Sequence, residues 1–134
     1  MIDDFAKRAQ QTSLDLRELF PATPLQHNDY LSQKYGAEIW LKREDLTPVR
    51  SYKLRGAFNA MRKVRAADSQ QGHFVCASAG NHAQGVAFHA QRLGLHAVIV
   101  MPRFTPGGKV ERTRGFGAEV ILHGDTLEEA RGHA

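Results

Sequence analysis

From residue 73 onward, short apolar runs alternate regularly with helical patterns, and this alternation limits the folds available to the chain. Three apolar runs predict strands, namely residues 73–77, 97–101 and 119–122. Helices are predicted between them, over residues 81–93 and from a Thr105 cap to near Gly115 or Gly117. Since the strands begin about 22 to 24 residues apart and each is followed by a helix, the spacing is typical of right-handed βαβ units. The sequence therefore predicts an α/β fold with an open parallel sheet and flanking helices.

Capping residues place shorter elements around this sheet. Asn28 can cap a short helix that Gly36 ends, and the alternation of residues 37–42 predicts a half-buried strand. Asp125 and Glu128 have the spacing of a capping box at the start of a last helix. The pattern thus adds two short helices and one strand to the elements of the sheet.

Lys53 lies in the first turn of a helix that is predicted from a Ser51 cap to about Arg65. It falls one position beyond the edge of the apolar stripe of this helix, which suits a residue that lines a cleft. The positive end of the helix dipole disfavours a second positive charge there, and the neutral amine is the form that a nucleophile or base requires. We therefore interpret Lys53 as a candidate Schiff-base lysine. The alternative is a solvated surface group, which most lysines are.

A second candidate is the turn after the first predicted strand, where residues 78–82 read Ser-Ala-Gly-Asn-His. In open parallel sheets, ligands bind beyond the carboxyl ends of the strands, and the start of the following helix favours an anion. Gly80 allows close backbone approach, while Ser78 and Asn81 add side-chain hydrogen bonds. An ordinary turn with a capping residue explains the same pattern, so both hypotheses stay open. The run is neither a Walker A loop nor a dinucleotide fingerprint, which disfavours nucleotide binding.

Charge and composition narrow the functional classes. The formal net charge is +4, and eight of the 18 basic residues fall between Lys42 and Arg65. Such a cluster can bind nucleic acid, attract a small anionic ligand or form a solvated helix face. Aromatic residues do not interleave with these charges, so a stacking surface for single strands is not indicated. We expect a small-molecule ligand and no nucleic-acid partner.

The remaining composition points to a soluble protein. No apolar run approaches the roughly 20 residues of a membrane span, and the acidic start lacks the pattern of a secretory signal. We therefore expect a cytoplasmic protein without a membrane partner. Cys76 is the one cysteine and lies in an apolar run, which favours a buried small side chain over a catalytic thiol. The histidines are scattered without metal-ligand spacing, so no metal site is predicted.

Two motifs carry a resemblance to a known family: residues 49–57, which contain Lys53, and residues 77–87, which contain Asn81. Shorter matches lie at residues 23–25, 41–45, 101–102, 105–106, 109 and 116–120. On these residues the chain, from about position 10 to its end, resembles the short-form threonine dehydratases of the fold-type-II pyridoxal-phosphate enzymes. The resemblance implies the tryptophan synthase β-like fold of that family.

The resemblance also implies roles for the residues of both motifs. Lys53 would hold pyridoxal 5′-phosphate covalently and, once freed, would act as general base at the substrate Cα. Asn81 would hydrogen-bond the phenolic oxygen of the cofactor. The substrate carboxylate would be gripped by Ser78, Ala79, Gly80, Asn81 and His82. The implied reaction is β-elimination on L-threonine to 2-oxobutanoate and ammonia, the first step of isoleucine biosynthesis.

The same resemblance implies that the sequence is part of a longer protein. Residues 1–48 correspond to the N-terminal part of the large cofactor-binding domain, and residues 49–134 to most of the small domain, truncated at its C-terminal end. The family's glycine-rich phosphate loop, and a later serine or cysteine against the cofactor ring, do not occur in these 134 residues. We therefore expect an inactive or partial fragment of an incomplete fold, from a parent protein that forms a homo-oligomer.

Two other functions stay open. Serine dehydratases and serine racemases share both motifs, and only one methyl group separates serine from threonine. A non-catalytic folding or interaction fragment, which has lost cofactor binding, is the alternative of another class.

Overall fold

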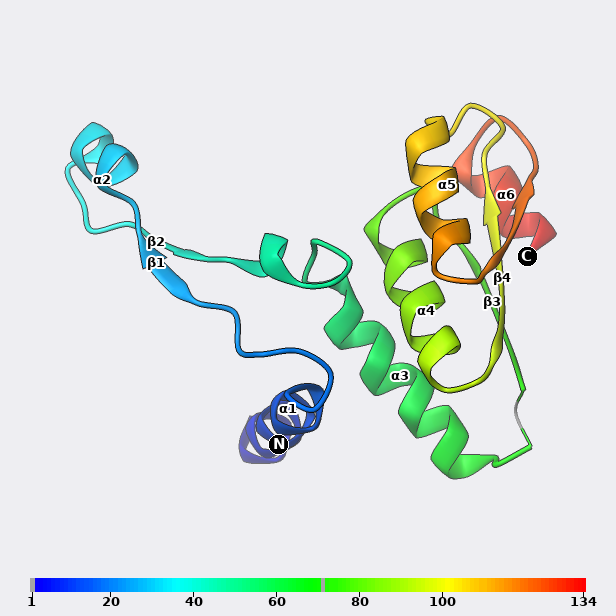
Figure 1. The fold of residues 1–134 in the computed structure, drawn as a ribbon, viewed down its shortest axis with the longest axis horizontal. Coiled ribbons are helices and arrows are strands. Elements are labelled where there is room, and N and C mark those ends of the chain that lie inside the picture. Colours follow the sequence, from blue (N-terminus) through cyan, green and yellow to red (C-terminus); the bar gives the residue numbers. More distant parts are fainter. Residues whose placement is uncertain (1, 71) are drawn as a thin grey trace. The chain divides into compact units, whose positions relative to one another are not determined.

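Three strands form the parallel sheet of the computed structural model, which describes residues 2–70 and 72–134. They are β3 (His73–Ala77), β4 (His96–Met101) and β5 (Glu119–Leu122). Their order in the sheet is β3-β4-β5 with both pairings parallel, so the strands are neighbours in the sheet as they are in the chain (Figure 1). The predicted α/β class and open parallel sheet are confirmed.

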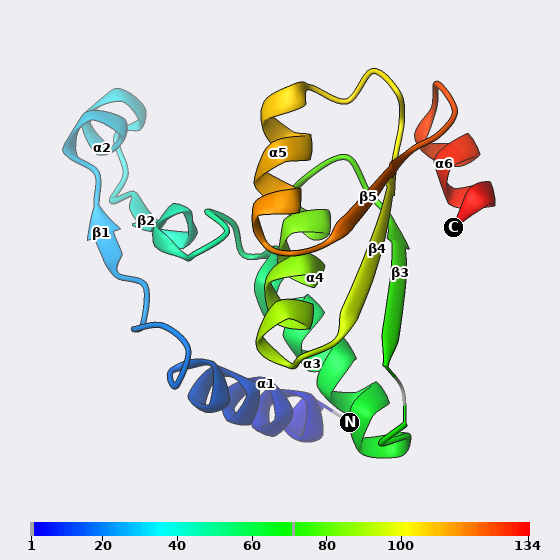
Figure 2. The ribbon, with the colours of Figure 1, turned by 45° about the vertical axis from the view of Figure 1, so that its right-hand side comes forward.

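Helices cover both faces of this sheet. α4 (Asn81–Arg92) and α5 (Gly107–Gly115) lie on one face, and α6 (Leu127–His133) lies on the other (Figure 2). The buried residues of α4 include the small side chains of Ala83, Ala87 and Ala90. They form one core cluster with Ala97 and Ile99 of β4. Small side chains let the helix approach the aliphatic strand closely, which fixes the height of α4 above the sheet.

The chain divides into two compact units, Met1–Tyr52 and Lys53–Ala134, and the sheet belongs to the second. The second unit begins with α3 (Lys53–Ala67), which packs beside α4 (Figure 1). The first unit contains α1 (Ile2–Leu16), β1 (Leu25–His27), α2 (Asp29–Tyr35), β2 (Trp40–Lys42) and the short 3₁₀ helix η1 (Glu44–Leu46). Among the described residues, no helix has the length and apolar character needed to cross a membrane.

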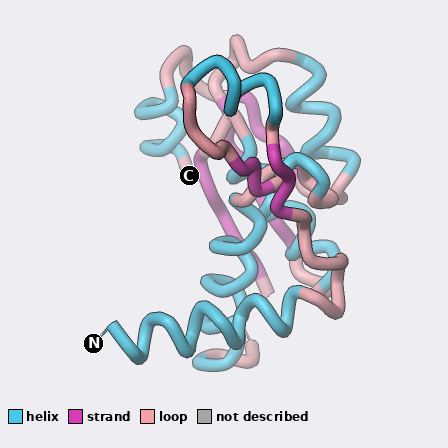
Figure 3. Tube along the Cα trace, turned by 90° about the vertical axis from the view of Figure 1, so that its left-hand side faces the viewer, coloured by secondary structure: helices cyan, strands magenta, loops and turns pink. Residues whose placement is uncertain are grey.

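In the first unit, α2 begins and ends at the residues that the sequence predicts. Asn28 Oδ1 accepts a hydrogen bond from the Leu31 N–H at 2.8 Å, and Gly36 ends the helix with φ of 61°. The strand predicted over residues 37–42 is shorter: it is β2, which forms an antiparallel two-stranded ladder with β1 (Figure 3). The prediction that this strand is half-buried is wrong, because all of β2 is exposed. Side chains of a two-stranded ladder point to its two faces, and they are buried only where another layer packs on one of these faces.

The start of α6 lies one residue later than predicted. Thr126 is the N-cap: its hydroxyl accepts from the Glu129 N–H at 3.2 Å, and the Glu129 carboxylate accepts from the Thr126 N–H at 3.3 Å. The capping box therefore joins Thr126 and Glu129, not Asp125 and Glu128. The carboxylate of Asp125 instead binds Arg103, with Nη2 and Oδ1 2.8 Å apart.

The cap of α5 also differs from the prediction. The Pro106 carbonyl accepts hydrogen bonds from the N–H groups of Lys109 at 2.8 Å and Val110 at 3.3 Å, so Pro106 is the N-cap and α5 begins at Gly107. Thr105 therefore does not cap the helix. Its hydroxyl oxygen is buried and has no hydrogen-bond partner among the described residues.

Candidate active site

The carboxyl end of β3 leads directly into the turn that the sequence predicts as an anion site. The Ser78 N–H donates to the Val100 carbonyl at 3.1 Å, which extends the pairing with β4 one residue beyond β3. The Ser78 hydroxyl accepts hydrogen bonds from the N–H groups of Gly80 and Ala83, both at 3.3 Å. Ser78 thus satisfies an amide in the first turn of α4, as the alternative hypothesis of a capped turn requires. Its own hydroxyl hydrogen can still donate to a ligand, because these two bonds use only its oxygen lone pairs.

Ser78→Ala is expected to lower the free energy of unfolding by about 1 kcal/mol, because two amides of the turn lose a side-chain acceptor. Urea denaturation of the two proteins measures this difference. Ser69→Ala, in the exposed loop after α3, is the matched control and should stay within about 0.5 kcal/mol of the unsubstituted chain. Equal midpoints for Ser78→Ala and Ser69→Ala would contradict the prediction.

The start of α4 offers amide donors beside open space. The first amides of an α-helix have no partner within the helix, and they lie at its positive end. A Cβ atom built on Gly80 would meet no atom within 4 Å, so the space next to this residue is open. Five residues are predicted to bind substrate. The three in the turn, Ser78, Ala79 and Gly80, are half-buried, and the two on the helix, Asn81 and His82, are exposed. The arrangement suits the binding of a small anionic group.

Lys53 is the first residue of α3, and the structure brings it near His82. Partial burial, and secondly the positive charge of Lys53, lower the pKa of His82 below its ordinary value of 6.5. The imidazole of His82 is therefore mostly neutral at pH 7, and it can donate one hydrogen bond and accept another. The candidate amine therefore lies close enough to His82, the last residue of the candidate anion site, for its charge to act on the imidazole.

Two residues that sequence reasoning left without a role hold α3 against α4. A Cβ atom on Gly85 would lie 3.1 Å from Leu54 Cα and 3.3 Å from the carbonyl carbon of Lys53, so only glycine fits here without a shift of the backbone. One turn further along α4, His89 Nε2 lies 2.8 Å from the Leu54 carbonyl oxygen. Gly85 and His89 are four residues apart, and residues with this spacing share one face of a helix. This spacing is the sequence signal that both residues face the same neighbour.

His89 makes the stability of the fold sensitive to acid. Burial is the main cause that lowers the pKa of His89 to about 4 from the ordinary 6.5. The unfolded chain therefore binds a proton more readily between pH 6.5 and pH 4, so stability that is complete above pH 6.5 is lost as the pH falls through this window. We expect His89 to lower the free energy of unfolding by about 2 kcal/mol between pH 7 and pH 5.

Denaturant titrations at both pH values check this expectation in the unsubstituted chain and in His89→Gln. Glutamine does not titrate, so the variant should show a smaller decrease on acidification. The other histidines are present in both proteins and cancel in the comparison. The same decrease in both proteins would assign the acid sensitivity to other groups.

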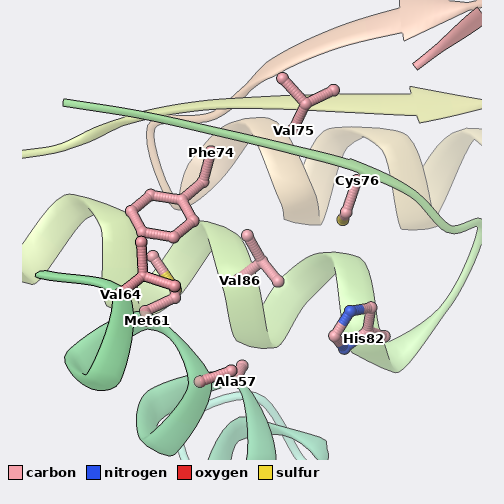
Figure 4. Close-up of a pocket in the computed structure, with 9 residues that line it drawn as sticks. Ala57, Met61, Val64, Phe74, Val75, Cys76, His82 and Val86 are labelled. Carbon is pink, nitrogen blue, oxygen red and sulfur yellow. The ribbon is translucent and has the colours of Figure 1, made fainter. Parts of the chain in front are cut away.

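An apolar groove of about 250 Å³ lies between α3, β3 and α4, with His82 at one end (Figure 4). Its walls include Met61 of α3, Phe74 of β3 and Val86 of α4. Cys76 also lines the groove, and burial raises the pKa of its thiol to about 11. The thiol is therefore protonated at neutral pH, which supports the predicted role of a small apolar side chain over that of a nucleophile.

A lysine that opens one helix, next to an amide-rich turn at the end of a parallel strand, is a suitable arrangement for a covalently held anionic cofactor. The family described as pyridoxal-phosphate dependent enzyme matches residues 16–134, and the chain belongs to this family. The matched segment contains both compact parts of the candidate site, Lys53 and residues 78–82. The predicted family and its cofactor, pyridoxal 5′-phosphate, are confirmed.

Within this family, the chain is similar to proteins named as threonine dehydratases or deaminases. The chain is 50% identical over 127 residues to the biosynthetic L-threonine dehydratase IlvA of Staphylococcus saprophyticus, covering 92% of this chain and 30% of that protein. It is 53% identical over 112 residues to the chloroplastic biosynthetic threonine dehydratase 1 of Solanum lycopersicum, covering 84% of this chain and 18% of that one. The solved structure of the processed form of threonine deaminase isoform 2 from Solanum lycopersicum matches with a TM-score of 0.76 and 39% identity, over 96% of this chain and 36% of that chain. The chain thus spans only about a third, or less, of the length of these relatives.

Proposed function

We propose that this chain carries the lysine and the carboxylate-binding turn of a pyridoxal-phosphate-dependent ammonia-lyase that converts L-threonine to 2-oxobutanoate and ammonia. The observation that carries the proposal is the position of Lys53 at the start of α3, close enough to His82 for its charge to act on the imidazole. The names of the relatives support threonine as the substrate and a biosynthetic role. We propose that this role is the first step of isoleucine biosynthesis, as the resemblance to short-form threonine dehydratases implies.

The residues present fit the cofactor. Lys53 supplies a primary amine at the edge of its helix, and the exposed Asn81 supplies an amide that can bind a phenolic oxygen. The space beside Gly80 is open, so no described atom blocks the approach of a ligand to the turn there. When bound, pyridoxal phosphate withdraws electrons from the substrate α-carbon, which is chemistry that no side chain provides.

The protein residues bind the substrate and move one proton. The amides at the start of α4, together with the Ser78 hydroxyl, bind the threonine carboxylate and hold it at the positive end of the helix dipole. A neutral His82 adds a hydrogen-bond donor there. The Lys53 amine takes the proton from Cα as general base. The C–O bond at Cβ breaks as the double bond to Cα forms, and the hydroxide leaves as water with the proton that Lys53 took from Cα. Hydrolysis of the resulting enamine gives 2-oxobutanoate and ammonia.

The proposal also assigns the chain to the domains of a longer enzyme. We assign residues 1–48 to the large domain and residues 49–134 to most of the small domain of a longer enzyme, which acts as a cytoplasmic homo-oligomer. We further propose that these 134 residues carry only part of the site, since the chain spans 30% of the length of the Staphylococcus saprophyticus enzyme. Serine is the alternative substrate, and a non-catalytic folding fragment is the alternative of another class.

Cofactor capture tests the proposal. The chain is mixed with pyridoxal phosphate, reduced with borohydride, digested and analysed by mass spectrometry for the labelled lysine. We expect yellow colour before reduction and the label on Lys53. Labels spread over several surface lysines, with none on Lys53, would favour the non-catalytic fragment. If the label is on Lys53, a second assay decides the substrate. It measures 2-oxobutanoate formed from threonine and pyruvate formed from serine, in the longest protein that the gene encodes.

A further inference from the structure

We propose that His89 is a positioning residue for Lys53: it anchors the first turn of α3 to α4 through the Leu54 carbonyl. The inference rests on the proposed function of Lys53, but its first observation does not need the cofactor. His89 is 1% exposed, and its Nε2 lies 2.8 Å from the Leu54 oxygen. A carbonyl oxygen can only accept, so Nε2 carries the hydrogen and donates it.

Two aromatic rings contact the imidazole of His89. The rings of Phe58 and Phe88 lie with their centroids 5.2 and 5.1 Å from that of His89. Phe58 comes from α3 and Phe88 from α4, so His89 fills the space between the two helices. Close packing against these two rings restricts the orientation of the imidazole and of its N–H.

The anchor acts one residue from the candidate nucleophile. Leu54 is fully buried and directly follows Lys53. A hydrogen bond to the Leu54 carbonyl therefore fixes the backbone one residue after the candidate nucleophile. A carbonyl oxygen has two lone pairs, so it can accept from His89 and from the fourth following amide of the helix. Gly85, one turn earlier on α4, contacts the backbone of Lys53 and Leu54. The contact at Gly85 sets how closely the two helices approach each other. The hydrogen bond from His89 sets where along α4 the first turn of α3 lies.

Two substitutions separate the hydrogen bond from the filling of space. His89→Leu keeps an apolar side chain between the two rings but has no donor. His89→Gln keeps an N–H donor that can reach the carbonyl. Thr113→Val is the control for general destabilisation, because it removes a hydrogen bond of 2.9 Å from a fully buried threonine on α5.

The first measurement is amide hydrogen exchange in the apo chain. We expect His89→Leu to increase exchange in the first two turns of α3 about tenfold relative to the unsubstituted chain, whereas His89→Gln stays within about threefold. The second is the rate of Lys53 labelling by pyridoxal phosphate and borohydride, which should fall about tenfold in His89→Leu because a small misplacement of a reacting group has a large effect on rate. Thr113→Val should change neither.

The outcomes separate this inference from the function it rests on. Labelling of Lys53 at the unsubstituted rate in His89→Leu overturns the positioning role, as does a fall of equal size in Thr113→Val. If the unsubstituted chain never labels Lys53, the proposed function is overturned and exchange alone decides the anchor. In that case, unchanged exchange in His89→Leu refutes the anchor, and faster exchange confined to the start of α3 supports it.

Discussion

Lys53→Ala is expected to abolish covalent capture of pyridoxal phosphate and to reduce any lyase turnover by at least about a hundredfold. The variant lacks both the amine that would hold the cofactor and the base that would remove the Cα proton. Borohydride reduction followed by peptide mass analysis measures the first effect, and 2-oxobutanoate release in the longest protein that the gene encodes measures the second. Folding should change little, because Lys53 is an exposed residue at a helix end.

Two controls make this result specific. Lys53→Arg keeps a positive charge beside His82 but removes the nucleophile, because a guanidinium stays protonated. It should therefore fail in the same way as Lys53→Ala. Lys63→Ala, which removes an exposed lysine from the same helix, should label and turn over as the unsubstituted protein does. Normal product formation in Lys53→Ala would refute its assigned role.

Gly85→Val is expected to lower the free energy of unfolding by about 3 kcal/mol. A Cβ atom at this position would lie 3.1 Å from Leu54 Cα, and the atom it meets belongs to backbone, which cannot turn aside as a side chain can. The branched side chain must therefore push the start of α3 away from α4, and Lys53 moves with it. Chemical denaturation measures the change in stability, and the rate of Lys53 labelling measures the displacement.

Gly56→Val is the matched control, since it makes the same substitution at the exposed fourth residue of α3. A Cβ atom on Gly56 would meet nothing within 4 Å, and valine is slightly better than glycine in a helix. Its stability should therefore stay within about 0.5 kcal/mol of the unsubstituted chain. Similar losses in both variants would contradict the prediction, because a Cβ atom meets the backbone of α3 only in Gly85→Val.

The sheet could be predicted from the sequence because its signals are local. The apolar run of β4 and the regular spacing of the helices define the parallel strands, and Asn28 and Gly36 mark the ends of α2 through their own side chain and backbone. β1 escaped prediction because three residues carry no period, and pairing with β2 defines it. The cap of α6 moved to Thr126 because Asp125 binds Arg103, a partner from a distant part of the sequence.

Only the part of the candidate site that follows a local sequence pattern could be proposed from the sequence. Residues 78–82 lie at the end of β3, where a general rule for parallel sheets places ligands, so one strand and one helix were sufficient to propose them. His89 could not be found in this way, because a single histidine in a helix gives no sign of what it contacts. Its role, and that of Gly85, depends on the packing of α3 on α4, which no local pattern encodes.

The strand order has a consequence for how the second unit folds. His73 pairs with His96 and Val98 pairs with Glu119, so each pairing closes a chain segment no longer than one helix and its turns. The entropy lost on closing a loop grows with its length, and these segments are among the shortest that can join parallel strands. Strands can therefore be added one after another as the chain emerges from the ribosome, and the lysine-bearing helix precedes them all.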